Sequence, residues 1–437
     1  MIQKFKSKLD IHTLEVVVKS SKTMLVKVAG LIVGLLISIF LGRTLGPEGL
    51  GIINFANKLG MILLILTMFG FSNVILKFIA IAKSKQDDAS IATSLKTSLI
   101  FNGLLSMGIA GIAAILLPVI LKWWSGNQEL YIPLLIAFVM LIPQTFSRVF
   151  AAALIGYGKI WQANLVNQTL STILVGLGLL LYWVFDIGYT PVSVLLLYAV
   201  SRVLLAFVVM VLWGHTFKSN SKGEFNLKPM FKMALPMLLI TGTGVIASNA
   251  DVIMLGTLGT LEDVGIYSVA ARLALLTSLF LQVTNAAVAP KLASLFSDTK
   301  IEEMGIMVQR VTKGLTIIAF SFVMVFVVFG QLMLGLWGAE FQEAYWVLVI
   351  LAIGQFFNIT TGCAGLLLMM CGYEKVHGYI SAIAVLLNII LNIVLIKTYG
   401  ALGAAIATAI TVMISNVTKV IFAKRNTGIL TIPIFKL

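Results

Sequence analysis

The sequence predicts an all-α membrane protein with about twelve transmembrane helices, arranged in two pseudo-symmetric six-helix lobes. Three observations lead to this fold class. Of the 437 residues, 59% are hydrophobic and only 11% are charged, whereas charged residues make up about 25% of an average soluble protein. Apolar runs of about 18 residues or more recur along the chain, which is the length that a spanning helix needs. A loop in the first half of the chain returns in the second half.

Apolar runs separated by short polar connections set the limits of the predicted helices. The longer runs exceed the ~20 residues that cross a bilayer, so we expect those helices to tilt or to project beyond it. The predicted spans are residues 22–42, 51–81, 92–119, 131–156, 161–185, 190–214, 230–257, 263–290, 304–336, 342–369, 377–398 and 400–423.

The longest polar connection, GHTFKSNSKGEFNLKP, falls in the middle of the chain and predicts a linker between two halves. The first 21 residues alternate lysine with apolar residues, a pattern typical of a helix that lies in the membrane interface. The predicted organisation is an interfacial segment 1–21, an N-terminal lobe 22–214, a linker 215–229, a C-terminal lobe 230–425 and a tail 426–437.

Positive charge alternates between successive loops. Lysines gather in the N-terminal segment, the central linker and every second loop, while the other loops carry only Arg43, Lys122 and Lys397. The positive-inside rule therefore places both termini and the linker in the cytoplasm, and an even number of helices agrees with this. The rule also explains most of the net charge of +14, which in a soluble protein would suggest nucleic-acid binding.

The repeated loop indicates internal symmetry. Residues 41–59 (LGRTLGPEGLGIINFANKL) and 255–273 (LGTLGTLEDVGIYSVAARL) are identical at seven of 19 positions. Six predicted helices separate the two copies, so both copies lie on the same side of the membrane. Two lobes related by an axis along the membrane normal are an architecture of transporters, in which the substrate path runs between the lobes.

Each copy of the loop has features of a helix start. In the first copy Pro47 and Glu48, and in the second Thr260 and Asp263, stand where a span begins. Proline fits the first helical turn, acidic residues there interact favourably with the helix dipole, and Thr260 with Asp263 matches a capping box. We therefore expect the loop to turn the chain and to start a helix, in preference to binding substrate directly.

Four cations, Lys58, Arg148, Arg202 and Arg272, lie deeper in the predicted spans than snorkelling from the helix ends explains. A lone cation at the bilayer centre costs about 2.5–3.5 kcal/mol on insertion scales, so such residues face a cavity or a partner. Asp251 is the one acidic residue deep inside a predicted span, because Asp263 and Glu343 lie at the very start of theirs, so positive charge is in excess. The excess predicts a cationic cavity that receives an anion.

Two asparagines belong to the same predicted site. Asn54, Asn57 and Lys58 share one helical face, and Ser268 with Arg272 repeats part of this pattern in the second half. Lys58 and Arg272 occupy equivalent places in the repeat, roughly 10–12 Å along their helices from the outer ends. The candidate substrate-binding residues are therefore Lys58, Arg272, Arg148, Arg202, Asn54 and Asn57.

Asp251, in the run SNADVIML, has two possible roles. It is a candidate for binding the ion that drives transport, because acidic residues inside a membrane commonly mark ion pathways. It could equally form a structural ion pair with Arg272, which the next helix brings to a similar depth. The chain carries no Walker loop, zincin motif or other cofactor or metal motif, so we expect no catalytic residues, no cofactor and no metal site.

Several segments together resemble one known family. They are the repeated loop, NADVIMLG around Asp251, GTLEDVGIYSVAARL, WGAEFQEAYWVLVILAIGQ (residues 337–355) and LLLMMCGYEK (residues 366–375). In this order and spacing they resemble the polysaccharide-transporter branch, typified by O-antigen flippases, of the multidrug/oligosaccharidyl-lipid/polysaccharide (MOP) exporter superfamily. The resemblance extends from about Lys22 to Arg425.

The resemblance implies a V-shaped exporter that works by alternating access and is ion-coupled. Its implied substrate is an undecaprenyl-pyrophosphate-linked oligosaccharide, a repeat unit of a surface polysaccharide, moved from the inner to the outer leaflet of the cytoplasmic membrane. A polysaccharide polymerase and a chain-length regulator would be its partners, with no nucleic acid. Asp251 matches an aspartate that is frequent in the family.

Three alternatives remain at this point. A multidrug exporter of the same superfamily would need carboxylates to bind organic cations, and a lipid II-type flippase usually has fourteen helices. A membrane-bound polysaccharide polymerase or ligase would carry a large outer loop with catalytic residues, whereas the outer loops predicted here are short. These features favour the lipid-linked oligosaccharide flippase.

Overall fold

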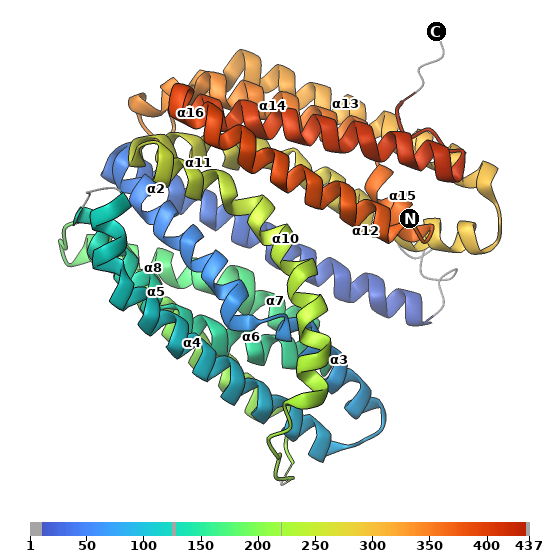
Figure 1. Ribbon diagram of the computed structural model, residues 1–437, viewed down its shortest axis with the longest axis horizontal. Helices are drawn as coiled ribbons and strands as arrows, with labels where there is room; N and C mark the ends of the chain where they lie inside the picture. Colours follow the sequence, from blue (N-terminus) through green and yellow to red (C-terminus); the bar gives the residue numbers. More distant parts are fainter. Residues whose placement is uncertain (1–10, 125–127, 220, 434–437) are drawn as a thin grey trace. The chain divides into compact units, whose positions relative to one another are not determined.

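The computed structural model describes residues 11–124, 128–219 and 221–433, and its regular structure consists of helices (Figure 1). These helices form two compact units. The first unit holds the described residues of Met1–Phe40 together with Ala56–Val245, and the second holds Leu41–Phe55 together with the described residues of Ile246–Leu437. The predicted lobes, 22–214 and 230–425, stay a prediction, and the units differ from them in the placement of residues 41–55 and 230–245.

Within the described residues, nine helices are long and apolar enough to cross a membrane, so the chain is a multi-pass membrane protein. The number is below twelve for a local reason. Helices α2 (Ile11–Met68) and α16 (Glu374–Thr427) each contain two predicted spans, joined across a single non-helical glycine, Gly46 or Gly400. Both glycines have positive φ, 68° and 51°, which costs glycine little.

The predicted fifth span, 161–185, is also divided. It contains α7 (Ile160–Asn164), a π-helical segment (Leu165–Leu170) and α8 (Ser171–Val184), and α8 alone is too short to count as a span. Residues 11–21 form the first turns of α2, and residues 1–10 of the predicted interfacial segment lie outside the described residues.

The remaining helices follow in chain order. In the first half they are α3 (Phe71–Ser84), α4 (Asp88–Trp124), η1 (Gln128–Leu130), α5 (Tyr131–Val139), α6 (Leu141–Gly156) and α9 (Pro191–Thr216). In the second half they are α10 (Lys228–Leu258), α11 (Leu261–Leu276), α12 (Ser278–Ser297), α13 (Ile301–Leu334), η3 (Ala339–Ala344), α14 (Tyr345–Thr360) and α15 (Ala364–Met370).

The second predicted span, 51–81, is broken between α2 and α3. Phe69 and Gly70 have positive φ there, 45° and 77°. The Asn102 amide of α4 donates hydrogen bonds to the carbonyl oxygens of Thr67 and Met68, at 2.8 and 2.9 Å. A side chain from another helix thus provides partners for the last two carbonyl groups of α2 at the break.

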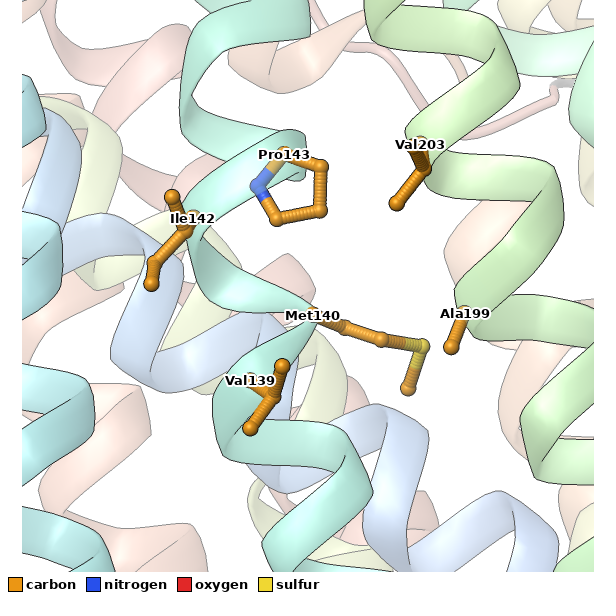
Figure 2. A pocket seen from close by; sticks show the side chains of 6 residues that line it. All are labelled: Val139, Met140, Ile142, Pro143, Ala199 and Val203. Carbon is orange, nitrogen blue, oxygen red and sulfur yellow. The ribbon is translucent and has the colours of Figure 1, made fainter.

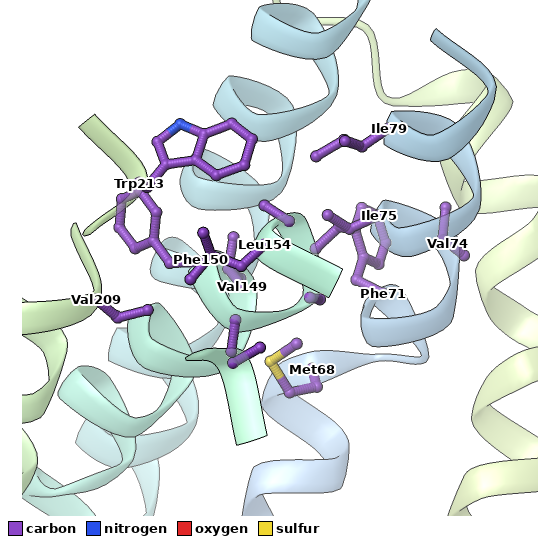
Figure 3. Packing of buried hydrophobic residues seen from close by; sticks show 14 of the residues in the cluster. Met68, Phe71, Val74, Ile75, Ile79, Val149, Phe150, Leu154, Val209 and Trp213 are labelled. Atoms are coloured by element: carbon purple, nitrogen blue, oxygen red, sulfur yellow. The ribbon is translucent and has the colours of Figure 1, made fainter. Parts of the chain in front are cut away.

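The core of the first unit lies among α3, α6 and α9. Phe71, Ile75 and Ile79 of α3 face residues of α6 such as Leu154, and Trp213 of α9 closes the cluster (Figure 3). Phe71, Ile75 and Ile79 are fully buried. This packing fixes α6 against α9 and so positions the polar residues that these two helices carry.

The predicted linker is held on α4 over part of its length. Lys96 donates to the carbonyl oxygen of Gly223 at 2.9 Å. The hydroxyl oxygens of Thr93 and Thr97 accept hydrogen bonds from the backbone N–H groups of Glu224 and Asn226, at 3.0 and 2.9 Å. Residues 223–226, which precede α10, are therefore fixed on α4, and we call this segment the strap.

In the second unit, α14 packs against both α13 and α16 (Figure 1). The predicted capping box is confirmed, because Thr260 and Asp263 exchange hydrogen bonds at the start of α11. The Asp263 carboxylate also accepts a hydrogen bond at 2.9 Å from the backbone N–H of Ala401, directly after the kink at Gly400. One acidic residue therefore starts α11 and ties it to α16.

The two copies of the repeated loop pack on each other inside the second unit. A Cβ built on Gly51 would lie 1.8 Å from the carbonyl oxygen of Leu261, and one built on Gly265 would lie 1.9 Å from that of Pro47. The repeat aligns Gly51 with Gly265 and Pro47 with Leu261, so the contact is reciprocal. The shared glycine permits a close backbone approach that any side chain would prevent.

Candidate functional site

Two deep arginines lie on neighbouring helices of the first unit. Arg148 lies on α6 and Arg202 on α9, and these helices pack against each other. Both side chains are half-buried, and their charges are close enough to repel. Neither α6 nor α9 contains an aspartate or a glutamate, so neither helix supplies a carboxylate to neutralise the pair.

Buried donors near these charges lack partners. The Nε atom of Arg202 and the Oγ atom of Ser147, next to Arg148 in the chain, are buried without a hydrogen-bond partner among the described residues. An unmade hydrogen bond to a buried group costs about 1–3 kcal/mol, and more for a charged group. Phosphate oxygens would satisfy such donors, because guanidinium groups bind phosphate in a bidentate manner.

Asp251 of α10 has a different environment in the second unit. Its carboxylate accepts hydrogen bonds from the Tyr267 hydroxyl at 2.7 Å, the Asn392 amide at 2.8 Å and the Thr408 hydroxyl at 2.7 Å. These neutral donors come from α11 and from both halves of α16. Asn388 extends the cluster by donating to Thr408 at 3.3 Å.

The Asp251 cluster is rich in oxygen atoms. Besides the carboxylate, the Oδ1 atom of Asn392 is buried without a hydrogen-bond partner, and Asn392 itself is fully buried. The Asn388 amide oxygen and the Thr408 hydroxyl add two further oxygens. Carboxylate, amide and hydroxyl oxygens are ligands for hard cations, and a buried carboxyl group can alternatively carry a proton.

The sequence-predicted partner of Asp251 was Arg272, and the structure supplies Tyr267 from the same helix. Tyr267 and Arg272 are five positions apart in the sequence, which sets their side chains about 140° apart around α11. The hydroxyl that faces Asp251 is therefore not on the arginine's side of the helix. The Asp251–Arg272 ion pair stays a prediction.

The other predicted site residues follow the two shared glycines in the sequence. Asn54 and Ser268 are equivalent positions of the repeat, one turn beyond Gly51 and Gly265, and each has a buried polar atom without a partner among the described residues. Asn57, Lys58 and Arg272 are half-buried. Lys58 belongs to the first unit and Arg272 to the second, so each is described within its own unit.

Sequence reasoning missed Tyr267, Asn388, Asn392 and Thr408. Asn388 and Asn392 stand four residues apart within the predicted span 377–398, so they share one helical face. Two amides on one face of a membrane helix are a detectable signal, because buried polar groups there need partners. The spacing of the two asparagines does not reveal that Asn392 donates to Asp251, which is 141 residues away in the sequence.

The chain resembles several known proteins in sequence. A family model described as "Polysaccharide biosynthesis protein" matches residues 16–296, and a second, MatE, matches residues 233–394. The chain is 28% identical over 218 residues to a probable low-salt glycan biosynthesis flippase, Agl15, of Haloferax volcanii. It is 24% identical over 255 residues to a capsular polysaccharide biosynthesis protein, CapF, of Staphylococcus aureus.

These alignments cover only part of each protein. They include 49% of this chain and 46% of the Haloferax protein, and 57% of this chain and 64% of the Staphylococcus protein. The chain thus matches about half to two thirds of the length of these curated relatives.

Solved structures share the fold over almost the whole chain. An inward-facing multidrug resistance MATE family transporter of the MOP superfamily has a TM-score of 0.74 at 15% identity, over 94% of this chain and 98% of its own. The lipid II flippase MurJ, in an inward closed conformation, also has a TM-score of 0.74, at 16% identity, over 93% of this chain and 87% of its own. At this level of identity the likeness concerns the fold.

The fold and the sequence matches lead to the same family. The helical fold is that of MOP-superfamily exporters, which confirms the fold class and the resemblance found in the sequence. The polysaccharide biosynthesis model covers more than half of the chain. The chain belongs to the polysaccharide biosynthesis protein family of multi-pass membrane proteins.

Proposed function

We propose that this protein is a flippase that moves a lipid-linked oligosaccharide, joined to an isoprenoid carrier through a diphosphate, from the inner to the outer leaflet of the cytoplasmic membrane. The pair Arg148–Arg202 carries this proposal. Two guanidinium groups on helices that pack together, with a buried Nε atom that lacks a partner and no acidic residue on either helix, suit an anion of about two charges. Relatives named as a glycan biosynthesis flippase and a capsular polysaccharide biosynthesis protein support the same substrate class.

Lys58, Arg272, Asn54 and Asn57 contribute to the same function in this proposal. Lys58 and Arg272 are equivalent in the repeat, and both are cations that a membrane helix carries only at a cost. Each would contact the anionic head of the substrate at some stage of the cycle. Because arginine offers a bidentate fork and lysine a point charge, Arg272 would contribute more than Lys58.

Asp251 is the proposed ion-coupling residue. Its carboxylate is held between α10, α11 and α16, so binding of a cation or a proton would change hydrogen bonds to three segments at once. A ligand that binds only one arrangement of these helices shifts the protein toward that arrangement. Ion binding at Asp251 would therefore supply the free energy for one direction of transport.

The orientation and the partners are part of the proposal. The positive-inside pattern supports cytoplasmic termini and a cytoplasmic strap. A transporter of diphosphate-linked repeat units would deliver them to a polysaccharide polymerase and a chain-length regulator. In this proposal the chain itself makes or breaks no covalent bond.

Translocation in vesicles tests the function. Purified full-length protein is reconstituted, and a radiolabelled isoprenoid diphosphate oligosaccharide is followed from one leaflet to the other by protection from an added glycosidase. We expect protein-dependent transfer of the diphosphate-linked substrate and much slower transfer of the corresponding neutral isoprenol glycoside. Equal transfer of both compounds, or preferential transport of a cationic drug, would overturn the proposal in favour of another MOP-type activity.

A further inference from the structure

A recess on the apolar outside of the first unit has no part in the function described so far. It lies where α5 passes into α6, opposite α9 (Figure 2). Its volume is about 230 Å³. Its lining is entirely apolar: Val139, Met140, Ile142, Pro143, Ala199 and Val203.

Local sequence explains why the recess exists. Met140 separates α5 from α6, and Pro143 in the first turn of α6 has no N–H and a short ring. Ala199 on α9 presents only a methyl group to this bend (Figure 2). The backbone is nevertheless satisfied across the bend, since Met140 N–H donates to Ile136 and Gln144 N–H donates to Met140, at 3.0 and 3.1 Å. The recess is thus a formed feature of the fold.

The recess opens on an exposed, apolar side of the unit. Val139 and Val203 at its rim are each 57% exposed, on helices that belong to predicted or candidate membrane spans. An apolar recess at this place is open to hydrocarbon, so its occupant is an apolar chain.

The same pair of helices carries the deep arginines. Arg202 directly precedes Val203 and follows Ala199 by three residues, about 4.5 Å along the helix axis. Arg148 lies on α6, within electrostatic reach of Arg202. A buried donor for an anion and a recess for an apolar chain therefore occur at the same depth, on the same two helices.

We propose that this recess binds the stretch of isoprenoid chain next to the diphosphate of the substrate, while Arg148 and Arg202 bind the diphosphate itself. The inference rests on the proposed function and adds a lipid-chain site to it. An isoprenoid chain gains nothing in a hydrated, cationic space, so it must leave sideways into lipid while the head group crosses. A recess beside Arg202 would bind the isoprenoid chain while the head group crosses the membrane.

Two valines of α9 provide a matched test. Val203 lines the recess, whereas Val200 lies three residues earlier and does not, and their exposures are 57% and 56%. Val203→Trp should fill the recess and lower the translocation rate of the isoprenoid diphosphate oligosaccharide by about tenfold, equivalent to ~1.4 kcal/mol. Val200→Trp adds the same bulk to the lipid-facing surface, and it should leave the rate unchanged.

Photocrosslinking tests occupancy without relying on transport. A photoreactive amino acid is placed at position 203 or at position 200 of the full chain in vesicles, with a radiolabelled isoprenoid diphosphate as the probe. We expect crosslinking from position 203 that excess unlabelled isoprenoid diphosphate competes away, and only background from position 200. Equal labelling from both positions, or equal capture of labelled phosphatidylglycerol at position 203, would show nonspecific lipid contact and overturn the proposal.

The two proposals fail in different ways. If Arg202→Glu loses transport while Val203→Trp and Val200→Trp both retain it, the lipid-chain site is wrong and the flippase function stands. If the wild-type protein does not translocate the diphosphate-linked substrate at all, the function itself is wrong.

Discussion

The two units place opposite charges in their interiors, and they treat these charges differently. In the first unit, Arg148 and Arg202 repel each other, and the Nε atom of Arg202 lacks a partner among the described residues. In the second unit, the Asp251 carboxylate accepts three hydrogen bonds from neutral donors. In the proposed function, a bound anion would supply the partner that the first arrangement lacks, whereas the carboxylate of the second arrangement already has partners and would exchange them for a cation or a proton.

This difference indicates a division of tasks. A site for a large anionic substrate binds it more tightly when its hydrogen-bond donors are already positioned and lack partners in the protein, because the ligand then supplies the missing acceptors. A coupling site gains from being satisfied in both states, since a carboxylate that lost all its partners would be too costly inside a membrane. The repeat gives both halves a similar frame, but only the second half holds an acidic residue within a predicted span.

The largest expected effect is the loss of transport when the arginine pair is reversed. Arg202→Glu should reduce translocation on the order of a hundredfold or more, because removing one partner of a buried charge interaction costs about 2–5 kcal/mol. Arg202→Lys keeps the charge without the fork and should retain part of the activity. The measurement is surface polysaccharide in a strain without its own flippase, with membrane levels checked by blotting. Normal export by a well-inserted Arg202→Glu protein would contradict an anion site at this pair.

Neutralising Asp251 should have the next largest effect and a different character. Asp251→Asn keeps the size and one oxygen, so the protein should insert and still bind the diphosphate lipid, but translocation should no longer respond to an imposed sodium or proton gradient. The measurement is the transport rate in vesicles with each gradient applied in turn.

A double substitution separates coupling from structure at Asp251. If the carboxylate serves only to pair with Arg272, then Asp251→Asn combined with Arg272→Gln should recover what the single change lost. Recovery would reject ion coupling at this residue, and continued loss would support it provided that Arg272→Gln alone retains transport.

A smaller effect is expected from single donors around Asp251. Tyr267→Phe removes one hydrogen bond, worth about 1 kcal/mol, and should change the ion dependence of transport by roughly fivefold. Tyr379→Phe on α16 is a suitable control, because Tyr379 is 70% exposed. An unchanged ion dependence in Tyr267→Phe would indicate that the hydroxyl is not part of the ion site.

The smallest effect concerns a carboxylate of the first unit that lies outside both candidate sites. Asp87 caps α4, and hydrogen bonds from the Ser90 side chain and backbone hold the pKa of this carboxyl below its usual value. Because the folded-state pKa is the lower one, the stabilisation is present above the ordinary pKa and is lost as pH falls through the folded-state pKa. Ser90→Ala should therefore lower the melting temperature slightly at pH 7 and not at strongly acidic pH. A difference that grows on acidification would contradict this cap.

Sequence reasoning was most successful where structure is local. Pro47 after the turn at Gly46, and the Thr260–Asp263 capping box, depend on residues within one turn of each other, and both could be predicted. The break between α2 and α3 depends on Asn102, whose side chain donates hydrogen bonds to the last two residues of α2, 35 and 34 positions earlier in the chain. No periodicity in the sequence reports such a contact.

The candidate sites divide in the same way. The deep cations and Asp251 could be identified from the sequence because a charge inside an apolar run is unusual. That Arg148 and Arg202 lie on helices that pack together, and that Asp251 accepts a hydrogen bond from Thr408 across 157 residues, follows from the tertiary packing alone. The reciprocal contact of Gly51 and Gly265 explains why the loop repeats its glycine, a backbone reason that comparing the two segments could only suggest.

One binding measurement tests the division of tasks directly. Purified wild-type, Arg202→Glu and Asp251→Asn proteins are titrated in detergent with a short-chain isoprenoid diphosphate, and the same preparations are assayed for gradient-driven translocation in vesicles. The account predicts that Arg202→Glu loses both binding and transport, whereas Asp251→Asn keeps wild-type binding and loses only the response to the gradient. Wild-type binding by Arg202→Glu, or loss of diphosphate binding by Asp251→Asn, would contradict the assignment of the diphosphate to Arg148 and Arg202 and of the coupling ion to Asp251.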